Sequence, residues 1–348
     1  MVRVLIVGTG GMARAHAEAY ATMDGVRIVA GVDTDPDRLA AFQDRFGVEH
    51  GFASVDEALA WGEFDAVSNV TPDAIHHATT LPFLAAGKHV LCEKPLAANH
   101  ADAVEMRDAA AAAGVVNMVN LTYRNVPAVT AAAQMVQEGR IGEVRHFEAS
   151  YLQSWLTQPL WGEWSKESQW LWRLSSAHGS LGVLGDVGVH ILDFATLVAG
   201  ADPTSVSCRL TTFDKAPGGR IGEYVLDAND SFTMHLALSN DAVGVVHATR
   251  MASGHINDLR LRVFGTKGGI EASFEAEVSS LRICEGDLSK PVWTEVDTPE
   301  VATNYQRFIS AIQSGQSVQP DFARGALLQQ SLDGSVRSDE QFGLSQSF

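Results

Sequence analysis

The chain has 348 residues, of which 46% are hydrophobic, and its formal net charge is −17 because 42 acidic residues outnumber 25 basic ones. This length predicts two domains, and a negative surface without a basic patch argues against nucleic-acid binding. Three scattered cysteines (Cys92, Cys208 and Cys284) favour a reducing compartment, and no apolar run reaches the roughly 18 residues that span a bilayer, so we expect a cytoplasmic protein without membrane contact.

Within the first 120 residues, short apolar runs alternate with segments of helical pattern. The runs are continuous and rich in β-branched residues, which is typical of parallel strands buried on both faces. They cover Val2–Val7, 28–32, 65–70, His89–Cys92 and 115–119. Ser54 and Glu57 are spaced as in a capping box, and Gly87 and Gly114 stand where helices are expected to end. Residues 1–120 therefore predict an α/β domain with a doubly wound parallel sheet.

The pattern changes after residue 120. A helix is predicted over 128–140, and strands then dominate, several of which alternate apolar with polar residues. The predicted strands cover 144–151, 205–210, Ser231–Leu238, Val243–Thr249, 260–264 and 270–274. Helical patterns return at 303–314 and 321–336, and the last dozen residues look loosely held. Residues 121–348 therefore predict a second domain, whose sheet has one covered and one open face.

A glycine-rich turn follows the first predicted strand and opens the first helix. Gly8 permits a tight turn, Gly10 lets the backbone approach a pyrophosphate, and Ala13 allows close packing of helix on strand. The helix start, with Gly11 and Met12, offers free N–H groups and partial positive charge to phosphates. The turn therefore predicts dinucleotide binding.

Asp33 ends the second predicted strand, 20 residues after Ala13. A carboxylate there accepts hydrogen bonds from the adenosine ribose hydroxyls and repels a 2′-phosphate, so we expect NAD rather than NADP. Arg38 lies near enough to complicate this preference, and we include it among the cofactor contacts. Alternatively, Asp33 only caps a turn with Asp35 and Pro36.

Two further loops leave the carboxyl ends of predicted strands, where ligands bind in such sheets. They supply as candidate cofactor contacts Asn69, Thr71, Pro72, His76, Glu93 and Lys94. A lysine beside a proline in this crevice is an unusual use of a cation. Alternatively, Lys94 pairs with Glu93 on the surface, although adjacent residues of an extended segment point in opposite directions.

The strongest pattern outside the first domain is Gly-Asp-Val-Gly-Val-His-Ile-Leu-Asp over 185–193. In a helix Asp186, His190 and Asp193 share one face, and the other positions are apolar or glycine. Such a stripe is either a satisfied buried network or a functional site. Asp and His at this spacing can also chelate a metal, but no third ligand is evident, and we predict no metal site.

Hydride transfer from an alcohol needs a nicotinamide, a group that accepts the hydroxyl proton, a donor that steadies the oxygen, and fixed geometry. His190 suits the proton role because histidine titrates near neutral pH. Asp186 can set the histidine tautomer or hold the substrate, and the Lys94 ammonium can hydrogen-bond the reacting oxygen. Lys94, Asp186 and His190 are therefore the predicted catalytic residues.

In chain order the motifs are Gly-x-Gly-x-x-Ala from Gly8, Thr71-Pro72 with His76, Glu93-Lys94-Pro95, and Asp186-x-x-x-His190. Together they resemble the glucose–fructose oxidoreductase / inositol dehydrogenase / rhizopine-catabolism (Gfo/Idh/MocA) family over nearly the whole chain. The resemblance implies an NAD(P)-binding Rossmann domain and then an α+β domain for substrate binding and oligomerisation. That second domain has a large, mostly antiparallel sheet, whose open face often forms dimers or tetramers. The resemblance also implies Lys94 and His190 at the reacting hydroxyl, with Asp186 beside them.

Two segments depart from the family's pattern. Residues 179–182 lack the usual run of glycines, which alters a pocket wall but removes no catalytic group. Residues 121–127 keep an arginine and a proline but lack the aromatic residue after the arginine. By resemblance, Tyr123 and Arg124 are expected on the substrate side.

Five of the seven tryptophans lie within residues 151–173. Aromatic faces pack on the C–H faces of sugars, so Trp155 and Trp172 are candidate pocket residues, and Arg173 can donate to hydroxyl groups. The alternatives for this segment are a core plug or a subunit interface, where tryptophan is also favoured.

The sequence thus predicts an NAD(P)-dependent oxidoreductase acting on a sugar, a sugar derivative or an inositol-like cyclitol. A homodimer or homotetramer through the C-terminal sheet is expected. One alternative is a non-catalytic, nucleotide-dependent sugar sensor or regulator, which would not need Lys94 or His190. The other is a redox-neutral, NAD-dependent enzyme that cleaves glycosides.

Overall fold

The computed structural model describes residues 1–348, which divide into two compact units. The first unit comprises Met1–Leu121 with Ala302–Gln329, and the second comprises Thr122–Val301 with Gln330–Phe348. The chain therefore leaves the first unit near residue 121, returns to it near residue 302 and leaves it again within its last long helix. No helix combines the length and the apolar content that crossing a membrane requires.

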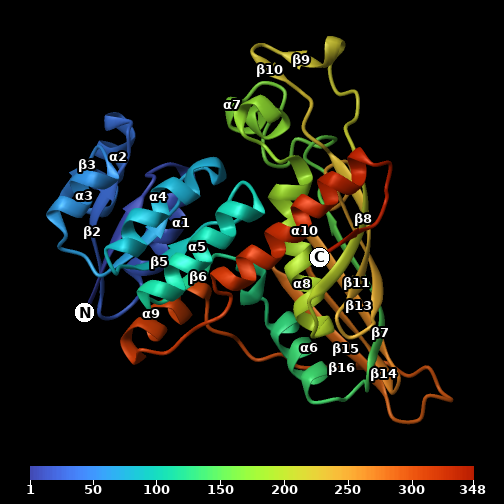
Figure 1. The fold of residues 1–348 in the computed structure, drawn as a ribbon. Helices are drawn as coiled ribbons and strands as arrows, with labels where there is room; N and C mark the ends of the chain where they lie inside the picture. The colour runs from blue at the N-terminus through green and yellow to red at the C-terminus, as the bar shows by residue number, and fades with distance from the viewer. The chain divides into compact units, whose positions relative to one another are not determined.

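The first unit contains a six-stranded parallel sheet of order β3-β2-β1-β4-β5-β6 (Figure 1). Its strands are β1 (Val2–Val7), β2 (Val26–Val32), β3 (His50–Phe52), β4 (Ala66–Asn69), β5 (His89–Cys92) and β6 (Asn117–Val119). Its helices are α1 (Gly11–Ala21), α2 (Pro36–Phe46), α3 (Val55–Trp61), α4 (His76–Ala85), α5 (His100–Ala113), α9 (Asn304–Ser314) and the first part of α10 (Phe322–Glu340). The predicted doubly wound parallel sheet is confirmed, and only the three-residue β3 lies outside the predicted strands.

The strand order reverses between β1 and β4. Strands β2 and β3 lie on one side of β1, whereas β4, β5 and β6 lie on the other. In open α/β sheets, ligands bind beyond the carboxyl ends of the strands at such a reversal. The turn after β1 and the loops after β4 and β5 start at this edge, so the topology gathers the predicted cofactor-binding segments.

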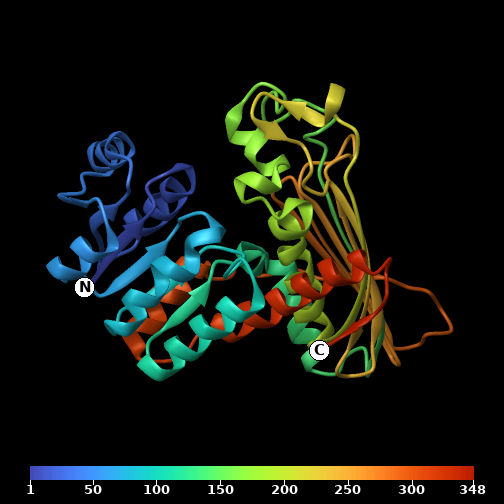
Figure 2. The same cartoon turned by 45° about the horizontal axis from the view of Figure 1, so that its top comes forward.

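Local sequence explains how helices of this unit begin. Asp35 Oδ1 accepts hydrogen bonds from the backbone N–H groups of Asp37 and Arg38, at 3.0 and 3.1 Å, and so caps α2. Ser54 caps α3 by accepting from Glu57 N at 3.2 Å. Helix α9 contacts β1 and α1 and completes the unit (Figure 2). The core that these elements share includes Val4, Ile6, Ala17, Leu91 and Phe308.

The second unit is built on a nine-stranded sheet of order β16-β15-β14-β13-β7-β12-β11-β8-β17. Strands β7 and β12 pair in parallel, and the other neighbours are antiparallel. The strands are β7 (Val144–Leu152), β8 (Pro203–Thr211), β11 (Ser231–Leu238), β12 (Val243–Thr249), β13 (Asp258–Gly265), β14 (Gly268–Glu275), β15 (Val278–Glu285), β16 (Thr294–Glu295) and β17 (Gln346–Ser347). The helices are α6 (Pro127–Gln137), α7 (Ser168–Leu171), α8 (Val189–Ala199) and the end of α10, and a separate hairpin pairs β9 (Arg220–Ile221) with β10 (Tyr224–Val225).

Helices α6 and α8 pack against one face of this sheet (Figure 1). The opposite face carries exposed side chains, among them His235, His247 and Val243, the last of which is 51% exposed. The predicted open-faced, mostly antiparallel sheet is therefore confirmed.

The end of the chain differs from the sequence prediction. Its last dozen residues were expected to be loosely held, yet α10 continues to Glu340 and β17 pairs with β8. Ser338 Oγ accepts a hydrogen bond from Cys208 N at 2.9 Å, and the Phe348 ring packs against Gly334. The prediction was wrong because the free edge of β8, formed far away in the sequence, offers backbone groups that this segment pairs with.

Candidate active site

The turn between β1 and α1 forms an open cradle. Gly8 has a φ of +84°, and a Cβ there would lie 2.9 Å from Val70 O, so only glycine fits. At Gly10 and the glycine after it, a Cβ would meet no heavy atom within 4 Å. Ala13 is buried against the sheet and Met12 is half-exposed. The free N–H groups of the helix start attract phosphate oxygens, so these residues fit the pyrophosphate of a dinucleotide.

The Asp33 carboxylate follows β2 and lies beside this turn. Its Oδ2 accepts hydrogen bonds from Thr9 N and Oγ1, both at 2.9 Å. Its Oδ1 accepts from Asp35 N at 2.9 Å and from Arg38 Nη2 at 3.2 Å. Burial by itself would raise the pKa of Asp33, but these hydrogen bonds together lower it. The turn-capping alternative is therefore present, and it coexists with an ionised carboxylate beside the glycine turn.

His76 joins the loops that follow β4 and β5. Its two ring nitrogens lie 2.8 Å from Thr71 O and 2.9 Å from Pro95 O. Asn69 is fully buried, and its Oδ1 accepts hydrogen bonds from Thr71 N and Oγ1. Asn69 and His76 thus hold the loops in shape, whereas Thr71 is half-buried and Pro72 is exposed.

The Glu93 side chain points into the first unit rather than onto its surface. His16 Nε2 lies 2.8 Å from Glu93 Oε1, and Asn120 Nδ2 donates to the same oxygen at 2.6 Å. Glu93 Oε2 accepts from the backbone N of Lys94 at 3.2 Å. Although burial opposes it, hydrogen bonding to His16 and Asn120 lowers the pKa of Glu93 to about 2. A surface pair between the Glu93 and Lys94 side chains is therefore contradicted.

Lys94 lies in the loop that follows β5, near the acidic residues Glu93 and Asp73. It is half-buried, and its backbone is tied to the Glu93 carboxylate. Burial raises the pKa of the neighbouring Asp73, against the opposing effect of the His76 and Lys94 charges. The ammonium group therefore lies near the same sheet edge as the nucleotide cradle.

In the second unit, Asp186 lies in a π-helical turn, Leu184–Gly188, that leads directly into α8. Two glycines let this wide turn pack closely. A Cβ at Gly185 would lie 2.4 Å from an atom of the preceding turn, and one at Gly188 would lie 3.1 Å from the Phe232 ring. The predicted regular helix over 186–193 is therefore wider at its start, and such π-turns are frequent at functional sites.

His190 is buried on α8, with its ring edge-on to that of Tyr123 at a centroid distance of 5.0 Å. The hydroxyl groups of Tyr123 and Tyr151 are hydrogen-bonded, and Tyr151 donates to Asn257 Oδ1 at 2.9 Å. Burial, together with the Asp186 charge, raises the pKa of Tyr123 to about 12 although the bond to Tyr151 opposes it. An imidazole, a carboxylate and neutral phenols are thus available in one region of the second unit.

Asp193, the third polar residue of the stripe, belongs to a buried ion pair. Arg124 donates from Nε and Nη2 to the two carboxylate oxygens of Asp193, both at 2.7 Å. Both side chains are at least nine-tenths buried. The pair ties the segment after the first unit to α8. A contact between Arg124 and substrate stays a prediction.

The tryptophan-rich segment forms a small core of its own. Its members are Trp155, Trp161, Trp164 and Trp170, packed with Leu156, Leu171, Leu174, Leu226 and residues of the β9–β10 hairpin. The Arg173 guanidinium lies 4.5 Å over the Trp172 ring and donates to Gln169 O at 2.6 Å. The core alternative is therefore observed, and sugar contacts by Trp155, Trp172 and Arg173 stay predictions.

Sequence reasoning missed two residues that support these side chains, His16 and Arg250. Arg250 is fully buried, and its Nη2 donates to Asp186 Oδ2 at 3.0 Å. His16 gave a usable signal, because it is a polar residue between Ala13 and Tyr20 on the apolar face of α1. Arg250 gave none, since it only follows a strand.

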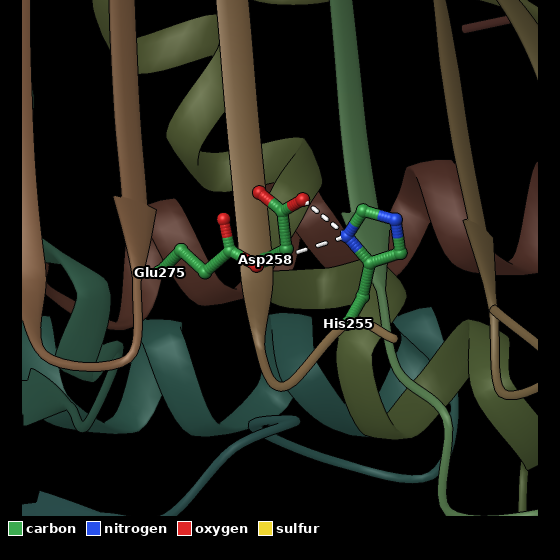
Figure 3. A group of neighbouring side chains, drawn as sticks. All are labelled: His255, Asp258 and Glu275. Carbon is green, nitrogen blue, oxygen red and sulfur yellow. Dashed lines mark hydrogen bonds and ion pairs between the residues drawn. The ribbon is translucent and has the colours of Figure 1, made fainter. Parts of the chain in front are cut away.

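A separate cluster contains His255, Asp258 and Glu275 (Figure 3). Asp258 Oδ2 lies 2.7 Å from His255 Nδ1, and Glu275 Oε1 lies 3.8 Å from the same nitrogen. Their donor atoms have metal-ligand character, but Arg260 donates to both Asp258 oxygens and to Glu275. Because Arg260 and His255 already contact both carboxylates, we interpret the cluster as a polar network that fixes the start of β13 and, with it, Asn257.

Comparison with known families gives two matches, one for each unit. The family described as "Oxidoreductase family, NAD-binding Rossmann fold" matches residues 2–121. The family described as "GFO/IDH/MocA C-terminal domain" matches residues 129–271.

Individual relatives agree with these matches. Levoglucosan dehydrogenase of Pseudarthrobacter phenanthrenivorans is 30% identical over 79% of this chain and 74% of its own length. Inositol 2-dehydrogenase of Rhizobium meliloti is 27% identical over 97% of this chain and 96% of its own. A solved levoglucosan dehydrogenase in complex with NADH and levoglucosan superposes with a TM-score of 0.85 at 27% identity, covering 99% of both chains.

Proposed function

Because the chain belongs to the Gfo/Idh/MocA family of NAD-binding oxidoreductases, we propose that it transfers a hydride between NAD and a hydroxyl-bearing carbon of a sugar, sugar derivative or cyclitol. The observation that carries the proposal is His190, a buried imidazole on α8 that stands edge-on to the Tyr123 ring and directly follows the turn holding Asp186. A polar group buried at this depth beside a partly exposed carboxylate is typical of acid–base chemistry.

NAD, which the turn at Gly8 and the Asp33 carboxylate would hold, would supply the hydride acceptor of the proposed reaction. His190 takes the hydroxyl proton and returns it in the reverse direction. Lys94 donates a hydrogen bond to the reacting oxygen and favours its alkoxide character. Asp186 orients the imidazole or accepts a hydrogen bond from a neighbouring hydroxyl. Tyr123 stays neutral at working pH, and because its proton is donated to Tyr151, its oxygen serves as an acceptor for a substrate hydroxyl. Arg124, Trp155, Trp172 and Arg173 are further candidates for substrate contact.

Asp33 supports NAD as the preferred cofactor over NADP. Its ionised carboxylate would accept hydrogen bonds from the ribose hydroxyls and repel a 2′-phosphate, and the nearby Arg38 guanidinium is itself hydrogen-bonded to Asp33.

The open face of the nine-stranded sheet supports association of subunits into a homodimer or homotetramer. Exposed apolar residues such as Val243 and Phe264 lie on strands whose other face is covered by helices. Exposed apolar side chains on one sheet face are typical of a subunit interface. The cytoplasmic location stays a prediction. The three cysteines form no disulfide, which is typical of proteins in a reducing compartment.

The proposal is tested by following the absorbance of reduced nicotinamide with purified protein, NAD or NADP, and a panel of levoglucosan, inositols, D-apiose, D-glucosides and glucose 6-phosphate. Turnover with one polyol class would establish reaction, substrate class and cofactor together. His190→Ala and Lys94→Ala should each lose most turnover while the Kd for NAD changes little; normal turnover in either would refute the assigned roles. Substrate conversion without net NADH would instead favour the redox-neutral alternative, and NAD binding without any reaction would favour the sensor.

A further inference from the structure

Arg250 is the largest fully buried side chain of the protein. It follows β12, and its backbone N–H donates to Asp230 O at 3.0 Å. Its Nη2 donates to Asp186 Oδ2 at 3.0 Å and its Nη1 to Arg173 O at 3.2 Å. The guanidinium carbon lies 4.9 Å over the Trp155 ring. The arginine therefore reaches from the sheet to the π-helical turn through the small tryptophan core.

Burying a guanidinium is costly unless opposite charges surround it. Burial lowers the pKa of Arg250, and the nearby Asp186 and Asp230 oppose that effect. Asp230 is itself paired with Lys215, whose side chain is almost fully buried. The Arg173 charge adds to that of Arg250, so Asp186 and Asp230 are the carboxylates that offset the buried cations Arg250 and Lys215.

Arg250 is not fully satisfied by its surroundings. Its Nε has no hydrogen-bond partner, although the atom is buried. An apolar side chain packed on Trp155 would avoid both this loss and the cost of desolvation. An apolar residue could replace neither the hydrogen bond to Arg173 O nor the charged one to Asp186. Of these two partners, Asp186 is the charged one, is 31% exposed and lies in the turn before His190.

We propose that Arg250 is a positioning residue, which holds the Asp186 carboxylate ionised and in one orientation at the active site. This inference rests on the proposed function for its kinetic consequence. The carboxylate is 31% exposed and lies on a wide turn, so solvent competes with the protein for its charge and its orientation. One oxygen fixed at 3.0 Å by a buried cation defines the direction in which the rest of the group faces.

The test is a double-mutant cycle with Arg250→Met, Asp186→Asn and the double variant, and Arg282→Met as an exposed arginine control in the same unit. We expect Arg250→Met to lower kcat by about 10–100-fold while the Kd for NADH stays within about twofold, because misplacement of a catalytic group costs rate rather than cofactor binding. In the Asp186→Asn background the same change should lower kcat by no more than about twofold, since Arg250 acts through Asp186. Arg250→Lys should recover part of the rate, because it restores the charge but not the planar fork.

Equal losses of kcat in the two backgrounds, or an unchanged kcat in Arg250→Met, would overturn the inference. If Arg250→Met does not fold, folding of the double variant supports the pairing, because the Asp186 charge that has lost the Arg250 cation is then the cause; failure of both overturns it. Absence of turnover in the unaltered chain refutes the proposed function alone. The same cycle measured by denaturant unfolding then decides the pairing: non-additive effects support it, and additive effects overturn it.

Discussion

The buried hydrogen bonds of Glu93 lead to a measurable prediction. Ser68 Oγ lies 2.7 Å from His16 Nδ1 and 3.1 Å from Tyr20 OH, and His16 Nε2 lies 2.8 Å from Glu93 Oε1. One proton arrangement satisfies every group. Tyr20 donates to Ser68, Ser68 donates to the neutral His16, and His16 donates to the Glu93 carboxylate. Replacing Glu93 by glutamine removes the negative charge to which His16 donates. It also replaces one carboxylate oxygen by an NH2 group, so one of the present donors to Glu93 loses its acceptor.

The size of the effect follows from the pKa of Glu93. A decrease from 4.5 to about 2 corresponds to about 3 kcal/mol, because one pKa unit is worth about 1.4 kcal/mol. The folded-state pKa is depressed, so the stabilisation is fully present above the unfolded pKa and is lost as the pH falls toward the folded one. The free energy of unfolding of Glu93→Gln should therefore be about 3 kcal/mol lower than that of the parent chain above about pH 5. The difference should shrink as the pH falls from about 4.5 toward about 2.

The assay is urea unfolding of parent and variant over this pH range, with signals assigned to the first unit. Glu105→Gln is a matched control, since His77 Nε2 lies 2.9 Å from Glu105 Oε2 but the carboxylate is 62% exposed. Glu105→Gln should lower the free energy of unfolding by less than about 1 kcal/mol at any pH. A Glu93→Gln effect as small as the control's, or one that does not diminish in acid, would refute the reasoning.

Three further predictions concern other parts of the molecule. Asp33→Ala should raise the Kd for NAD by about 10–100-fold and leave that for NADP nearly unchanged, as measured by isothermal titration; an unaltered preference would remove Asp33 from its role. Arg124→Met should lower the free energy of unfolding by about 3–5 kcal/mol because it leaves Asp193 buried and unpaired, and adding Asp193→Leu should restore most of it; additive losses would contradict the pairing. Burial raises the pKa of the Cys92 thiol, so native protein should be alkylated at the half-exposed Cys284 and not at Cys92, as read by mass spectrometry.

Features set by local spacing were predictable from the sequence. The turn at Gly8 follows a strand and opens a helix, and the continuous apolar runs such as His89–Cys92 require burial on both faces. The alternation in β11 predicts one covered face, which the burial of Phe232 and Met234 confirms. In each case the residues that determine the structure are neighbours in the chain, so their pattern is visible in one sequence.

Features set by distant partners were not predictable. Helix α9 returns to the first unit because its Tyr305 and Phe308 side chains pack beside β1 and α1, some 300 residues earlier in the chain. The π-turn at Asp186 depends on how closely Gly188 approaches Phe232. Arg250 meets Asp186 from a sequence separation of 64 residues. The spacing of residues along one helix or strand predicts none of these contacts, because each forms only when elements far apart in the sequence pack together.

Carboxylates that are hydrogen-bonded to a buried basic side chain recur beside the candidate functional side chains, and this recurrence has a physical reason. Glu93 is held by His16, Asp193 by Arg124 and Asp186 by Arg250. Apolar packing stabilises a helix or a strand without fixing the direction of one polar group, whereas a hydrogen-bonded charge pair fixes both the direction and the protonation state. Each of these pairs lies one step away from a residue proposed to act. Glu93 accepts from the backbone of Lys94, Asp193 is on the helix of His190, and Arg250 holds Asp186 itself. Substituting the supporting partners should therefore change the reaction rate more than it changes cofactor affinity, and this distinguishes them from the nucleotide cradle at Gly8.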